Sequence, residues 1–258
     1  MLRLGYDKFV TAGGDWGHWV VRELGANPKY AENVMAVHTN MCPSQPPVPK
    51  EQWTEREKIA QGMTDWWLGK PGNEKHMGYA IEMRTRPQTI GIAFSDNPVG
   101  ILSFVGEKYH ELVDPSFHSL DDSRFVDDVL TTVCLYYFTS PSVMTSMLCY
   151  YNNVRHEDYV VFNNKKENFI SRPMGFSSYR WDITPTSQRS VATTGRCEWF
   201  RGMWFLSCSS KLGYSSCKLI VESFECIEKD YGGHFIALEV PDDVVDDLRD
   251  CFKTLLKL

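Results

Sequence analysis

The stretch Gly13-Gly14-Asp15-Trp16-Gly17 decides the fold, because it joins a short apolar run at residues 8–14 to a helical pattern at residues 16–25. Its form, small–x–acid–x–small, is typical of a tight strand-to-helix turn that presents its central side chain for reaction. A second apolar run follows at residues 33–38. Strand, helix and strand in this order predict a βαβ unit of a parallel sheet, and therefore an α/β protein.

The central residue of this turn is an acid, which limits the chemistry it can perform. A carboxylate in this position attacks carbon directly and forms an ester intermediate, and the N-terminus of the following helix favours its anionic form. Asp15 could equally be the N-cap of a helix in an ordinary glycine turn. A dinucleotide-binding loop is disfavoured, because the glycines do not follow the G-x-G-x-x-G spacing.

Outside this unit, helical and sheet-like stretches alternate along the chain. A Pro-rich linker after residue 42 leads into helical periodicity with many aromatic residues. The periodic runs lie at 52–67, 99–109 and 124–151, a strand pattern at 168–176, and a final amphipathic helix at 241–258. We therefore predict a partial parallel sheet, built from residues 1–48 and 154–258 and interrupted by a helical cap insertion at residues 49–153.

An ester on Asp15 is useful only if water can later cleave it, which requires a histidine base oriented by a carboxylate. The expected chain order is nucleophile, acid, histidine. Asp182 follows the predicted strand at 168–176, and His234 lies in the Gly-rich segment Tyr231-Gly-Gly-His-Phe235 before the final helix. We predict Asp15, Asp182 and His234 as a catalytic triad. The remaining histidines are interpreted as structural or surface residues: His18, His38, His76, His110, His118 and His156.

Composition excludes several classes of function. The net charge of −6 and the lack of a Lys/Arg run argue against a nucleic-acid partner. No apolar stretch approaches the ~18 residues that would span a bilayer, and the charged N-terminus does not resemble a signal peptide. None of the eight cysteines forms a C-x-x-C pair, so we expect reduced thiols and no metal site. An ester mechanism needs no cofactor, and the sequence contains no Asn-x-Ser/Thr sequon, so we expect a cytoplasmic location.

Five segments together resemble the microsomal-type epoxide hydrolases of the α/β-hydrolase superfamily, especially their fungal members. The segments are Gly13-Gly-Asp-Trp-Gly17, His38-Thr-Asn-Met41, Gly78-Tyr79, Ser95-Asp-Asn-Pro-Val-Gly100 and Gly232-Gly-His-Phe235. The resemblance implies that a small apolar epoxide is converted to a vicinal diol through an Asp15 ester. It also implies that two cap tyrosines, Tyr79 and Tyr150, hold and protonate the epoxide oxygen. Tyr150 is the less specific of these two matches because Tyr151 is adjacent.

The chain also departs from this family in two places. The family has sheet strands and a His-Gly-x-Pro loop before the nucleophile, which this sequence does not show, so we expect a truncated form. The oxyanion hole is then reduced to the backbone N–H of Trp16. Residues 201–222 look inserted and carry Trp204 and Phe205, which we expect to be exposed and to promote aggregation.

Two alternative readings stay open, and so does the oligomeric state. The chain could be an inactive or catalytically impaired truncated homologue with low solubility and weak turnover. It could also be a haloalkane dehalogenase-like hydrolase, which uses an Asp nucleophile but needs Trp or Asn donors for the halide instead of paired cap tyrosines.

Overall fold

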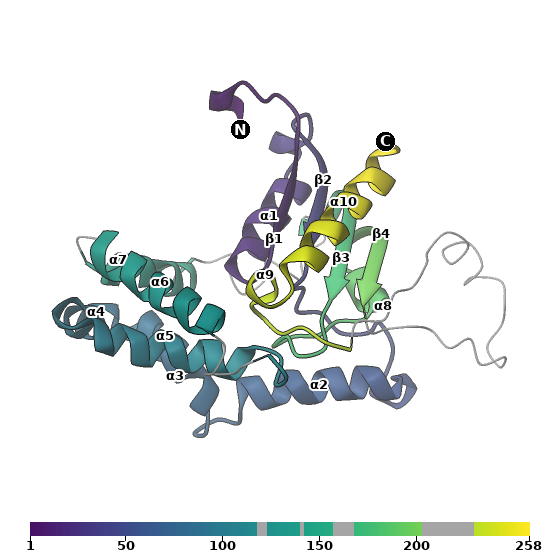
Figure 1. The fold of residues 1–258 in the computed structure, drawn as a ribbon. Helices are drawn as coiled ribbons and strands as arrows, with labels where there is room; N and C mark the ends of the chain where they lie inside the picture. Colours follow the sequence, from purple (N-terminus) through teal and green to yellow (C-terminus); the bar gives the residue numbers. More distant parts are fainter. Residues whose placement is uncertain (118–122, 140–141, 157–167, 203–229) are drawn as a thin grey trace.

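A four-stranded parallel sheet forms the centre of the computed structural model, which describes residues 1–117, 123–139, 142–156, 168–202 and 230–258. The strand order follows the sequence, and every neighbouring pair is parallel. The strands are β1 (Phe9–Gly13), β2 (Val34–Thr39), β3 (Ile170–Ser178) and β4 (Gly195–Gly202). The first three correspond to the predicted strands, so the α/β class is confirmed (Figure 1).

The fourth strand was not predicted, and its last two residues are the first two of the segment interpreted as inserted, 201–222. Arg201 and Gly202 pair with Ser177 and Ser178 of β3, so the segment interpreted as inserted from residue 201 begins with ordinary strand. The side chain of Arg201 is mostly buried because it pairs with Asp247 and Asp250 of the final helix. The rest of that segment, with Trp204 and Phe205, lies outside the described residues.

Helices cover both faces of the sheet. Alternation along a strand sends neighbouring side chains to opposite faces. Val37 and Phe200 therefore pack in the cluster that contains Val21 of α1 (Trp16–Ala26). Trp199 packs instead with Cys251 of α10 (Pro241–Leu256), on the other face. The βαβ unit and the final amphipathic helix are as predicted.

A layer of helices lies between β2 and β3 in sequence and beside the sheet in space (Figure 1). The region predicted as one helix at 124–151 consists of two, with Pro141 between them in the sequence; proline disrupts a helix interior. The helices are α2 (Glu55–Leu68), α3 (Gly78–Thr85), α4 (Pro87–Asp96), α5 (Pro98–Leu112), α6 (Ser123–Thr139) and α7 (Met144–Asn153). The domain boundaries at residues 48 and 153 stay a prediction.

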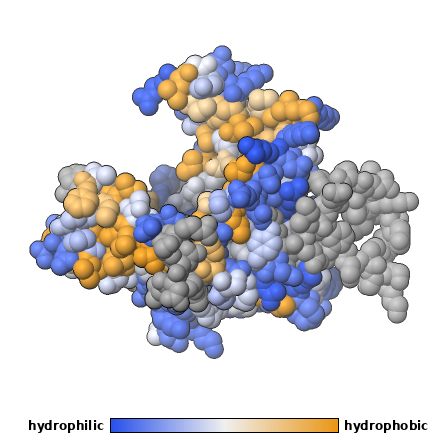
Figure 2. Space-filling model, in the orientation of Figure 1, coloured by the Kyte–Doolittle hydropathy of each residue, from blue (hydrophilic) through white to orange (hydrophobic). Residues whose placement is uncertain are grey.

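Apolar side chains are visible on the surface in two regions of Figure 2, near the N-terminus and along the helical layer. Leu4 near the N-terminus is 73% exposed, and Phe138 of α6 is 77% exposed. Within the described ranges, no helix combines the length and the apolar character needed to cross a membrane.

Candidate active site

The turn after β1 is held in a conformation that non-glycine residues rarely adopt. Asp15 has φ 46° and ψ −125°, and its Oδ1 accepts a hydrogen bond from the Trp16 backbone N–H at 2.6 Å. An N-cap residue normally has extended backbone and needs no positive φ. The capping role is therefore present, but it does not account for the strained backbone, which is a feature of functional turns.

Two of the three glycines in this turn are required by crowding. A Cβ on Gly13 would lie 2.9 Å from the backbone of Gly17, and one on Gly14 would lie 2.2 Å from the Asn40 side chain. A Cβ on Gly17 would meet nothing within 4 Å. The close approach of β1 and α1 therefore depends on the missing side chain of Gly13. Gly17, the last glycine of the turn pattern, has room for a side chain.

The predicted triad residues come together at one end of the sheet. Asp15 follows β1, Asp182 follows β3, and His234 precedes α9 (Ile236–Glu239). The Nε2 atom of His234 lies 3.0 Å from Asp15 Oδ2, and its Nδ1 lies 2.7 Å from Asp182 Oδ1. Asp182 Oδ1 also accepts from the Ile183 backbone N–H at 2.7 Å. One imidazole thus bridges two carboxylates that are far apart in sequence.

The two carboxylates make this histidine an unusually strong base. Burial disfavours its charged form, but Asp182 and Asp15 outweigh burial and raise the pKa of His234 to about 10. Burial likewise acts to raise the pKa of Asp15, and the hydrogen bonds from His234 and Trp16 outweigh it, so the pKa lies below the ordinary 3.8. The resting site at neutral pH therefore holds an ionised Asp15 and a protonated His234.

Tyr79 and Tyr150 face this triad from two helices of the helical layer. Tyr79 lies in α3 and Tyr150 in α7, with ring centroids 5.8 Å apart and a hydrogen bond between the side chains. The ring centroids of Trp16 and Tyr150 are 5.0 Å apart. Burial raises the pKa of Tyr79 to about 12 and raises that of Tyr150 further, so both phenols stay protonated at neutral pH.

A cavity of about 940 Å³ contains Asp15, His234 and both tyrosines in its wall. Most of its remaining lining is aliphatic or aromatic and comes from the helical layer, including Met83, Phe94, Ile101, Phe104, Val105 and Met147. Such a lining suits an uncharged, apolar ligand with few polar groups.

Sequence reasoning missed one charged residue in this wall, Lys108 of α5. Its Nζ lies 5.2 Å from the centre of the Tyr79 ring and is held by Glu107 and Glu111 at 2.7 Å. Lys108 is only 7% exposed. Lys108 lies in the polar stretch Gly106-Glu-Lys-Tyr-His-Glu111, where nothing in the sequence distinguishes it from an exposed lysine.

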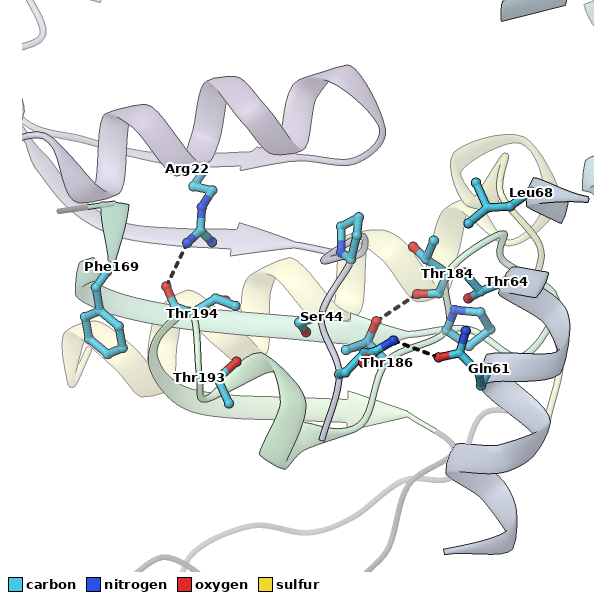
Figure 3. Close-up of a pocket in the computed structure, with 13 residues that line it drawn as sticks. Arg22, Ser44, Gln61, Thr64, Leu68, Phe169, Thr184, Thr186, Thr193 and Thr194 are labelled. Atoms are coloured by element: carbon cyan, nitrogen blue, oxygen red, sulfur yellow. Dashed lines mark hydrogen bonds between the residues drawn. The ribbon is translucent and has the colours of Figure 1, made fainter. Parts of the chain in front are cut away.

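A second cavity, of about 990 Å³, lies away from the triad between α1, α2 and the segments before β3 and β4 (Figure 3). Arg22 lines one end, where it donates to the Thr194 carbonyl at 3.2 Å, and Leu68 lies at the other. None of the predicted site residues lines it. Across the described ranges, no group of three or more His, Cys, Asp or Glu side chains could hold a metal ion.

Known proteins similar to this chain are epoxide hydrolases, although no family model matches it. Epoxide hydrolase 1 of Sus scrofa is 25% identical over 96% of this chain and 52% of its own length. Juvenile hormone epoxide hydrolase 2 of Ctenocephalides felis is 24% identical over 99% of this chain and 52% of its own. The chain therefore spans about half the length of the curated relatives it matches.

The solved structure of the Aspergillus niger epoxide hydrolase superposes on 99% of this chain and 55% of that one, with a TM-score of 0.74 and 27% identity. The chain is a homologue of the epoxide hydrolases of the α/β-hydrolase fold.

Proposed function

We propose that this chain carries the catalytic machinery of an epoxide hydrolase that opens an apolar epoxide to a vicinal diol. The single observation that carries the proposal is His234, which contacts both Asp15 and Asp182 within hydrogen-bond distance. That geometry suits a two-step reaction with an ester intermediate on Asp15. The mostly apolar cavity wall supports an apolar substrate.

The two oxygens of Asp15 have different partners and so different roles in the first step. Oδ1 accepts the Trp16 N–H, and Oδ2 faces His234. Oδ2 attacks an epoxide carbon, the carbon–oxygen bond of the ring breaks, and a phenol of Tyr79 or Tyr150 protonates the oxygen that leaves. Two neutral phenols can donate to a developing alkoxide without leaving a charge buried in the ground state.

Hydrolysis of the ester uses the other two members of the triad. His234 first returns its proton to the phenolate left by the first step. The neutral imidazole, oriented by Asp182, then takes a proton from water, and the resulting hydroxide adds to the acyl carbon. The charge that develops on Oδ1 is stabilised by the Trp16 N–H, which already points at that atom. Collapse of this intermediate breaks the bond between the acyl carbon and the former Oδ2. That oxygen takes up the proton that remained on the added oxygen and leaves as one of the two hydroxyls of the diol, which restores the Asp15 carboxylate.

The contacts of Trp16 argue against the dehalogenase alternative, which needs a Trp or Asn side chain that donates to the halide. The Trp16 side chain shares a hydrogen bond with Tyr150, and the two ring centroids are 5.0 Å apart, so the indole donor is engaged with the phenol. The strained turn and the assembled triad also oppose the alternative of an inactive homologue.

A single turnover in water labelled with heavy oxygen tests the proposal. The protein is used in excess over an apolar probe such as styrene oxide, and the label is located by mass spectrometry. We expect it in the peptide that contains Asp15 and not in the first-turnover diol, because water attacks the acyl carbon. The Asp15→Asn variant is the control and should take up no label. Label in the first-turnover diol would refute the ester intermediate.

A further inference from the structure

The segment that carries His234 is fastened to the end of α5 by a set of buried hydrogen bonds. The His234 backbone N–H donates to the Leu112 carbonyl at 2.7 Å, and the rings of Tyr109 and Phe235 stack with centroids 4.2 Å apart. A Cβ on Gly233 would lie 2.5 Å from the Leu112 carbonyl oxygen. The base is therefore attached to the same helix that lines much of the cavity.

Two carboxylates that the reaction itself does not use complete this attachment. Asp114 Oδ2 accepts from the Gly232 N–H at 2.9 Å, and Glu239 Oε2 accepts from the Gly233 N–H at 2.8 Å. Glu239 Oε2 also accepts from the Asp114 backbone N–H at 2.8 Å, which links the two acids. Asp114 is 6% exposed and Glu239 is 8% exposed.

Burying two acids near each other is costly unless they satisfy donors that nothing else could satisfy. Here they accept from the backbone of the two residues before His234, which are glycines and offer no side chain of their own. Gly232 has φ 82°, so the segment turns sharply at this point. Without the two acceptors, three buried backbone N–H groups would lack partners, and the segment would have to move.

We propose that Asp114 and Glu239 are positioning residues for His234, which set the reach of its Nε2 atom to Asp15. The part of this inference that concerns ester hydrolysis rests on the proposed function. The part that concerns the placement of the imidazole does not, and it can be measured without turnover.

The two acids differ in how they would tolerate amidation, which gives a matched pair of variants. Glu239 accepts the Gly233 and Asp114 N–H groups through Oε2 alone, the Phe235 backbone N–H also acts on the carboxyl, and burial raises its pKa toward the neutral form. Glu239→Gln keeps that single acceptor. Asp114 uses both oxygens, because Oδ1 accepts from the Ser116 N–H and hydroxyl. In Asp114→Asn the amide NH2 group must therefore face a donor, either the Gly232 N–H or the Ser116 N–H and hydroxyl.

The experiment is proton and nitrogen NMR of protein labelled at histidine. The proton that His234 Nδ1 shares with Asp182 should give a far-downfield resonance, since the bond is short and charge-assisted. We expect this resonance to persist in Glu239→Gln and in the exposed control Glu55→Ala, and to be lost in Glu239→Ala and Asp114→Asn. If Glu239→Ala does not fold, the shape-conserving Asp114→Asn variant decides the question.

Retention of the resonance in a folded Asp114→Asn or Glu239→Ala protein would overturn the proposal. So would its loss in Glu239→Gln, because that variant keeps the acceptor. In the labelled turnover assay, a displaced base should slow ester hydrolysis about 10²-fold and leave ester formation unchanged. A wild-type protein that forms no ester refutes the proposed function, and the NMR result still tests the positioning role.

Discussion

At the scale of single residues, the placement of His234 between two carboxylates makes the stability of the fold depend on pH. Its pKa is raised from 6.5 to about 10 in the folded protein. The stabilisation is fully present below pH 6.5 and is lost as the pH rises through 10. We expect the free energy of unfolding to fall across this window, because the folded protein holds a proton on His234 that the unfolded chain has already released.

Urea unfolding at a series of pH values measures this loss. Other groups also titrate at alkaline pH, so the His234→Gln variant serves as the reference and should show a flatter profile. Identical profiles for the two proteins would mean that His234 is not protonated in the folded state.

The two phenols give a second prediction at this scale. Because burial keeps both protonated, each is available to donate to the epoxide oxygen. Tyr79→Phe or Tyr150→Phe should slow ester formation by about 10²-fold, the lower range for a general acid, and the double variant should slow it further. The measurement is the rate of adduct formation in a His234→Gln background, where the ester is not cleaved. An unchanged rate in the double variant would remove the tyrosines from the mechanism.

The sequence predicted the residues that take part in the proposed reaction, but not the residues that hold them in place. Asp15, Asp182 and His234 could be identified because an ester mechanism dictates their types and their order along the chain. Tyr79 and Tyr150 came only from a family resemblance, since nothing in the spacing distinguishes them from packing aromatics. Asp114 and Glu239 were missed because their partners include backbone groups that meet only in the folded chain. Lys108 was missed because its contact with the Tyr79 ring forms only there.

At the scale of elements, the contact between β1 and α1 explains why small residues surround Asp15. Gly13→Ala would press a Cβ against the backbone of Gly17, and overpacking of this kind costs about 1–3 kcal/mol. Gly17→Ala introduces the same methyl group into open space within the first turn of a helix, where alanine is favoured over glycine by up to about 1 kcal/mol.

The two variants should therefore change the free energy of unfolding in opposite directions, which urea titration can measure. A destabilising Gly17→Ala would show that the glycine has a packing role after all. Element boundaries were predicted less well than this turn. The break between α6 and α7 was missed although proline marks it, and β4 was missed because its charged residues hid the strand pattern.

At the scale of the whole molecule, β1 has one neighbour in the sheet among the described residues. This strand pairs with β2 on one side, and Val10 within it is 36% exposed. Open edges of parallel sheets promote association with other strands. We expect a polypeptide of these 258 residues to self-associate as its concentration rises, which light scattering would detect.

Val10→Lys should reduce this association, because a charge on an edge strand opposes pairing. Val20→Lys on α1, where the side chain is 60% exposed, adds the same charge away from the edge and is the control. An equal effect of both variants would point to the helix surface, and no self-association in the wild-type protein would contradict the prediction.

The shared hydrogen between His234 and Asp15 has a consequence for the proton inventory of the proposed reaction. Ester formation removes the negative charge of Asp15, one of the two charges that hold a proton on the imidazole. The pKa of His234 therefore falls just after a phenol has donated its proton to the epoxide oxygen. The imidazole proton can restore the phenol, and the water that cleaves the ester recharges the imidazole. The resting site therefore already holds, on His234, the proton that replaces the one given to the first hydroxyl of the diol. Because a complete turnover neither releases nor takes up a proton, the pH of an unbuffered solution should stay constant.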